Sequence, residues 1–182
     1  MWFVYFYTME FQIQDHIPAD FHPTSRVWIY QSSRRFGFGE ALELDKVFTD
    51  FIQQWNSHGT PIKGYANLFF GQFIVIMADE TATGVSGCST DSSVRMIKSI
   101  EEVCKVQLFD RQMLAFLKND KVELLPLAQL PYAIEKGYIT TDTIYFNNLV
   151  STKAQLMEQW LQTVRESWLA QRFPVLAATP AS

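Results

Sequence analysis

Short segments rich in β-branched and aromatic residues predict the strands of this chain. One such segment covers residues 26–31. Residues 65–70 and 73–78 are apolar runs on either side of Gly71-Gln72, which predicts a hairpin with a two-residue turn. The second of these runs is apolar on both faces, so we expect a central strand that is covered on both sides. Three further strands are predicted. Residues 113–118 and 121–125 form a second hairpin through Asn119-Asp120, and residues 143–150 form a strand nearer the C-terminal end.

Apolar residues that recur at helical spacing predict four helices. In residues 40–57 the apolar stripe consists of Leu44, Phe48, Phe51 and Trp55, and His58-Gly59 is expected to end that helix. In residues 152–171 one long helix is predicted by a stripe at four-residue spacing that consists of Leu156, Trp160, Val164 and Trp168. The other two helices are expected over residues 91–105 and 128–136.

The order of these elements favours an α+β fold, a two-layer sandwich in which amphipathic helices pack on an antiparallel or mixed sheet built from hairpins. With 182 residues the chain has the usual length of one domain. We expect an N-terminal extension or arm over residues 1–16, one α+β domain over 17–173, and a frayed tail over 174–182. The apolar run Met1–Thr8 is too short to span a membrane. It is either an upstream extension, an added edge strand or a contact between subunits.

Composition and charge exclude several classes of protein. The net charge is -4 and no basic stripe is visible, which argues against nucleic-acid binding. No apolar run is long enough to cross a membrane. The two cysteines, Cys88 and Cys104, form no metal or disulfide motif, which favours a reducing, cytoplasmic location. No metal site and no cofactor motif is expected.

A polar loop is predicted between the central strand and the helix over residues 91–105. Hydroxyl groups and free backbone N–H groups at the start of a helix can bind a small anion. The predicted ligand-binding residues are Ser86, Gly87, Cys88, Ser89, Thr90, Ser92, Ser93, Arg34 and Arg95. The same residue types are also the ordinary caps of a helix, and capping alone remains the alternative.

Cys88 is the candidate catalytic residue, because a thiol at a helix N-terminus has a lowered pKa. His58 or Asp91 would act as its base or orient it. The spacing to Arg95 is Cys-X6-Arg, one residue longer than the Cys-X5-Arg of phosphatase loops. A small, inert thiol is the alternative interpretation.

Basic and aromatic residues from other segments could converge on the same loop and frame a pocket for a planar anion such as a nucleotide. Trp28 and Tyr30 lie on the same face of the first predicted strand and are interpreted either as core residues or as the frame of a pocket. The basic residues that such a pocket would gather are Arg34, Arg35, Lys63, Arg95 and Arg111.

Four runs in the sequence resemble a small uncharacterised bacterial family whose members are sometimes labelled "ABC transporter ATPase". The runs are residues 28–34 (WIYQSSR), 55–59 (WNSHG), 86–93 (SGCSTDSS) and 108–111 (LFDR). The resemblance covers residues 17–173 and implies no activity. ATPase activity is not expected, because the sequence lacks the Gly-X4-Gly-Lys-Ser/Thr phosphate loop.

The leading hypothesis is a non-enzymatic binding or interaction domain that takes a small anionic molecule at residues 86–93. The alternatives are a thiol-dependent enzyme that uses Cys88 and a structural or partner-binding protein. Self-association into a homo-oligomer is left open.

Overall fold

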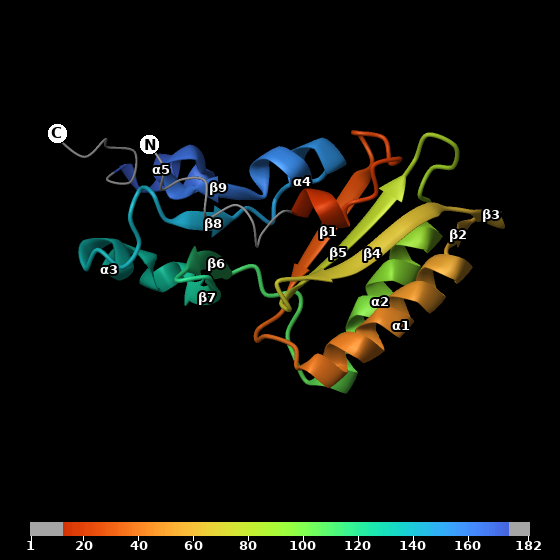
Figure 1. Ribbon diagram of the computed structural model, residues 1–182, viewed down its shortest axis with the longest axis horizontal. Coiled ribbons are helices and arrows are strands. Elements are labelled where there is room, and N and C mark those ends of the chain that lie inside the picture. Colours follow the sequence, from red (N-terminus) through yellow and green to blue (C-terminus); the bar gives the residue numbers. More distant parts are fainter. Residues whose placement is uncertain (1–12, 175–182) are drawn as a thin grey trace.

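The structure is a computed structural model that describes residues 13–174. In this part of the chain, helices pack on antiparallel sheets, so the predicted α+β class is confirmed. The strands form separate sheets rather than one continuous sheet (Figure 1). The predictions for Met1–Thr8 and for the C-terminal tail beyond residue 174 lie outside the described residues.

The first sheet has β5 (Phe73–Asp79) at its centre, between β1 (Arg26–Gln31) and β4 (Lys63–Phe69). Every residue of β5 is buried, which confirms the predicted central strand. The turn between β4 and β5 differs from the prediction. Phe69 faces Phe73 across the hairpin, so the connection has three residues. Phe70 and Gly71 both have positive φ, which supplies the left-handed backbone that the tight turn needs.

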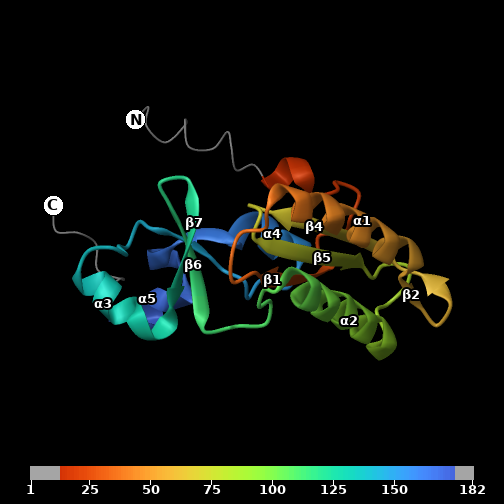
Figure 2. The same cartoon turned by 90° about the horizontal axis from the view of Figure 1, so that it is seen from below.

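Two long helices, α1 (Phe38–Gln54) and α2 (Gly87–Cys104), cover one face of this sheet and lie side by side (Figure 2). They run antiparallel, because Trp55 at the end of α1 contacts Ser89 near the start of α2. The predicted end of α1 at His58-Gly59 was wrong. The helix stops at Gln54, and His58 and Gly59 form the positive-φ turn between β2 (Asn56–Ser57) and β3 (Thr60–Pro61).

The second sheet has the order β7–β6–β8–β9. Its hairpin consists of β6 (Met113–Lys118) and β7 (Lys121–Pro126), and Asn119 and Asp120 both have positive φ, as expected for this tight turn. The hairpin projects from the rest of the fold in Figure 2. The remaining elements of this half are η2 (Leu127–Gln129), α3 (Leu130–Glu135) and β8 (Ile144–Phe146).

The predicted long helix over residues 152–171 was wrong. The chain forms α4 (Lys153–Gln159), β9 (Leu161–Thr163), η3 (Val164–Glu166) and α5 (Trp168–Arg172). New caps interrupt the helix: the Thr163 N–H and hydroxyl both donate to Glu166, and the Ser167 hydroxyl accepts from the Leu169 N–H. β9 pairs with β8, so this segment completes the second sheet.

A shared apolar core joins the two sheets. Phe73, Phe146 and Trp160 come from β5, β8 and the end of α4, and all three are fully buried there. Their rings form one cluster in which Phe73 and Phe146 are stacked with centroids 4.6 Å apart. The short helix η1 (Ile13–His16) adds Ile13 to the same core. Among the helices between residues 13 and 174, none has both the length and the apolar character that crossing a bilayer requires.

Candidate functional site

The predicted loop over residues 86–93 is mostly helix. Ser86 is the N-cap, and α2 begins at Gly87, four residues before the predicted start at Asp91. The Ser86 hydroxyl accepts the Ser89 N–H at 3.2 Å, and the Ser89 hydroxyl donates to Asn56 O at 2.9 Å. Ser89 is almost fully buried. Ser86 therefore caps the helix, and Ser89 binds it to the β2–β3 hairpin.

The other hydroxyl groups of this segment are also bound to the backbone. Thr90 donates to Ser86 O, Ser92 donates to Ser89 O, and Ser93 donates to Thr90 O, at 2.7 to 3.1 Å. Ser93 is buried. The helix itself uses the hydroxyl groups that were expected to hold an anion. Ser86 alone acts as the helix cap, and every other Ser and Thr from Ser89 to Ser93 donates its hydroxyl to a main-chain carbonyl.

The two predicted arginines do not converge on the start of α2. Arg34 lies at the opposite end of α2, where it donates to Cys104 O at 2.6 Å and to both carboxylate oxygens of Glu40 at 2.8 Å. An 18-residue helix separates these two ends by about 25 Å. Arg95 is exposed in the third turn of α2.

The structure places the Cys88 thiol at the surface, in the first turn of α2. His58 lies in the β2–β3 turn, and Asn56 of that hairpin contacts Ser89, so the two segments are neighbours. Within residues 13–174, however, no hydrogen bond or ion pair joins Cys88 to His58 or Asp91. Burial raises the pKa of the other thiol, Cys104, which is the opposite of activation. In the same described range, no three His, Cys, Asp or Glu side chains cluster as metal ligands would.

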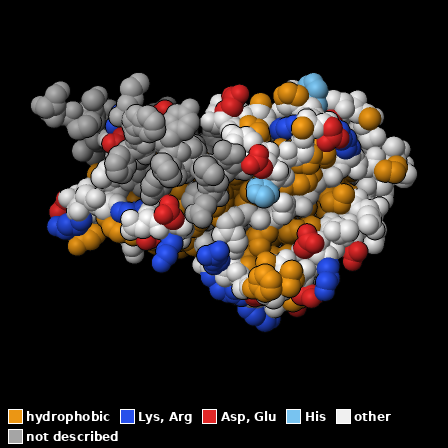
Figure 3. Space-filling model, in the orientation of Figure 1, with side chains coloured by type: hydrophobic (Ala, Val, Ile, Leu, Met, Phe, Trp, Pro, Cys, Tyr) orange, Lys and Arg blue, Asp and Glu red, His pale blue; other side chains and the backbone are white. Residues whose placement is uncertain are grey.

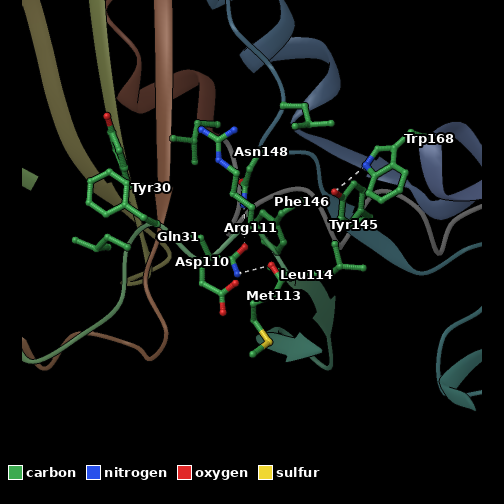
Figure 4. Close-up of a pocket in the computed structure, with 15 residues that line it drawn as sticks. Tyr30, Gln31, Asp110, Arg111, Met113, Leu114, Tyr145, Phe146, Asn148 and Trp168 are labelled. Atoms are coloured by element: carbon green, nitrogen blue, oxygen red, sulfur yellow. Dashed lines mark hydrogen bonds between the residues drawn. The ribbon is translucent and has the colours of Figure 1, made fainter. Parts of the chain in front are cut away.

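A cavity of about 310 Å³ lies between the two sheets. Its walls come from β1, from the segment that leads into β6, and from β8 and α5. Figure 4 shows Tyr30 on one side, Tyr145 and Trp168 on the other, and Arg111 between them. Tyr30 and Arg111 were both expected in a pocket, but that pocket was expected at the start of α2. Trp28, the other aromatic residue named for the pocket, instead packs edge-on against Trp55 in the core beneath the helices.

The aromatic walls of this cavity are held by specific contacts. The Tyr30 and Phe109 rings meet edge to face with centroids 5.5 Å apart. On the opposite wall, the Trp168 indole N–H donates to the Tyr145 hydroxyl at 3.1 Å. Burial raises the pKa of both tyrosines, so both phenols stay protonated at neutral pH. The cavity is therefore lined by rigid rings that carry neutral hydroxyl groups.

The polar floor of the cavity is a fixed chain of amide groups. Gln31 Nε2 donates to Met113 O at 3.0 Å, and Asn148 Nδ2 donates to Gln31 Oε1 at 2.8 Å. The Trp160 indole N–H then donates to Asn148 Oδ1 at 3.0 Å. Sequence reasoning did not identify Gln31 or Asn148, because they lie 117 positions apart and neither belongs to a motif.

A second hollow lies on the outer surface between α1 and α2. This groove of about 380 Å³ is lined mainly by apolar groups, among them Leu44, Val47 and Val103. Phe38 and Val103 are 83% and 77% exposed. Figure 3 shows hydrophobic side chains gathered where α1 lies beside β4. Self-association into a homo-oligomer, which the sequence left open, stays a prediction.

Comparison of the chain with models of known protein families, with curated proteins and with solved structures finds no match. The resemblance to a bacterial family therefore stays an expectation. The function has to be argued from the residues of this chain.

Proposed function

We propose that this protein is a non-enzymatic binding domain that holds a small organic molecule in the cavity between its two sheets. The single observation that carries the proposal is the cavity itself. Its volume of about 310 Å³ lies within the range of small-molecule sites, and its walls combine aromatic rings with a few polar groups. This combination is typical of ligand pockets.

The position of the cavity supports the same conclusion. Its walls come from both sheets, and ligand pockets often lie where separate units of a fold meet. The Gln31–Asn148 bridge keeps these walls in place without a ligand, so a ligand would meet a preformed site. Preformed sites lose less conformational entropy on binding.

The thiol-enzyme alternative is not favoured by any contact of Cys88. A reactive cysteine needs a basic partner or a positively charged environment that stabilises its thiolate. Cys88 is exposed, and its neighbours in α2 cap the helix. A non-enzymatic role is therefore the simpler proposal.

Isothermal titration calorimetry on a matched pair of variants tests the proposal. A set of small aromatic and aliphatic acids, amides and amines would first be screened by thermal shift. Leu149→Trp adds bulk at an exposed residue of the cavity rim, and Leu42→Trp makes the same change on the exposed face of α1. We expect Leu149→Trp to weaken binding of the hits at least about tenfold and Leu42→Trp to leave it unchanged. Hits that bind both variants equally, or no hits at all, would overturn the proposal.

A further inference from the structure

The charge inside the cavity indicates which class of ligand it takes. Of the described residues that line the cavity, Arg111 is the only one with a cationic side chain. Within residues 13–174 its guanidinium forms no ion pair and no hydrogen bond. Arg34, by contrast, is fully engaged by Glu40 and Cys104. Arg111 is therefore available to a ligand in a way that Arg34 is not.

The neighbouring acid does not neutralise Arg111. Asp110 Oδ1 accepts the Gln112 N–H at 2.8 Å. In Figure 4 the Arg111 guanidinium and the Asp110 carboxylate point in opposite directions. The guanidinium fork suits a carboxylate, which it can bind through two parallel hydrogen bonds.

The amide side chains of the cavity are bonded within the protein, so a ligand would be recognised by its charge rather than by many hydrogen bonds. Gln31 uses both ends of its side-chain amide within the protein, and so does Asn148. Tyr30 and Tyr145 are neutral phenols, which do not repel an anion. An anionic group at Arg111 would thus meet the guanidinium, while the Asp110 carboxylate, which also lines the cavity, points away from it.

The size and the walls of the cavity define the rest of the ligand. Rings pack well on aromatic walls in edge-to-face or offset arrangements. The Tyr30–Phe109 pair supplies one such wall, and Trp168 lies on the other. A volume near the lower end of the usual range suits one or two fused rings and is small for a nucleotide.

We infer that the cavity binds small aromatic carboxylates, with the ring against Tyr30 and Phe109 and the carboxylate on Arg111. This inference rests on the proposed function and names its ligand class. It transfers the expected anion site from the start of α2 to the space between the sheets.

The test compares an acid with its neutral amide. 2-Naphthoate and 2-naphthamide have the same rings and nearly the same shape, and only the acid carries a charge. Calorimetry would measure both against the wild-type protein, Arg111→Gln and the control Arg95→Gln. Arg95 and Arg111 are both exposed, so both variants should fold, and circular dichroism would verify this.

We expect wild type and Arg95→Gln to bind 2-naphthoate about tenfold more tightly than 2-naphthamide. Arg111→Gln should remove this preference and leave the affinity for the amide unchanged. Equal affinity of wild type for both compounds, or a preference that survives in Arg111→Gln, would overturn the inference while the proposed function stands. Failure of the whole compound set to bind would overturn the proposed function and the inference with it.

Discussion

The Asn148 side-chain amide donates to Gln31 Oε1 at 2.8 Å and joins the loop after β8 to the last residue of β1. Gln31 is buried, and its amide nitrogen reaches Met113 O at the start of β6. One pair of side chains therefore connects both sheets at the floor of the cavity. The shape of the proposed binding site depends on this bridge.

Asn148→Ala should destabilise the protein, because it leaves Gln31 Oε1 and the Trp160 indole N–H without a partner. Unpaired buried polar groups cost about 1–3 kcal/mol each, so we expect the free energy of unfolding to fall by roughly 2 kcal/mol or more. Urea denaturation would measure it. Gln53→Ala, at an exposed position in α1, is the matched control. If both variants are equally stable, the bridge does not hold the sheets together.

Asp79 makes folding sensitive to acid. Its carboxylate is buried and accepts hydrogen bonds from the Thr81 hydroxyl and N–H and from the His22 N–H. The Thr81 hydroxyl and these other donors hold the pKa of Asp79 well below its usual value. A lowered folded pKa gives stability that is present above the unfolded pKa, near 4, and that is lost as the pH falls further.

Asp79→Asn should lower the free energy of unfolding at pH 7 by about 1–3 kcal/mol and reduce its loss between about pH 5 and pH 2. Urea denaturation at several pH values would measure both effects. Asp50→Asn, on the exposed face of α1, should stay close to wild type at pH 7. Identical pH profiles for wild type and Asp79→Asn would refute this role.

Arg34 has a structural role at the joined ends of α1 and α2. Its hydrogen bonds, together with the Gly37 N–H, hold the pKa of Glu40 at about 2. Arg34→Gln should raise that pKa toward the usual value, as an NMR titration of the Glu40 carboxyl carbon would show. Binding of 2-naphthoate should not change in this variant. A large loss of affinity for 2-naphthoate would instead indicate that Arg34 contacts the ligand.

Substitutions at the start of α2 should change the stability of the protein as expected for a capped helix. Ser86→Ala removes the acceptor of the Ser89 N–H, and we expect it to cost about 1 kcal/mol of stability. Cys88→Ala, at an exposed position two residues away, should change stability by less than about 0.5 kcal/mol. Thermal and urea unfolding of the two variants compare them directly. If Cys88→Ala lowered the stability more than Ser86→Ala does, the thiol would have to make packing contacts in the fold.

Local patterns predicted the strands best where burial and turn chemistry agree. β1 has the predicted bounds, and β5 was recognised as central because both of its faces are apolar. The β6–β7 hairpin was recognised from Asn119-Asp120, which tolerate the positive φ of its turn.

The C-terminal segment could not be predicted from local spacing. Leu156, Trp160, Val164 and Trp168 recur every four residues, yet they do not share one helix face in the structure. Trp160 packs in the core between the sheets, whereas Val164 packs in the core of the second sheet. Pairing of β9 with β8 and the Thr163 and Ser167 caps override the helical pattern.

The candidate cavity was beyond sequence reasoning for a similar cause. Tyr30 and Arg111 were each considered as residues of a pocket, but their meeting place depends on how the two sheets pack. Trp168 was assigned to a helix stripe, and Gln31 and Asn148 carried no signal. The Ser-rich segment over residues 86–93 was predicted to bind an anion because helix-capping residues and anion-binding residues are the same residue types.

The central claim is that the ligand lies between the sheets, and NMR contacts between protein and bound ligand test it most directly. With 2-naphthoate bound to the wild-type protein, we expect nuclear Overhauser effects from the ligand ring protons to Tyr30, Phe109 and Leu149. Effects confined to Val85, Thr90 and Val94 at the start of α2 would contradict it.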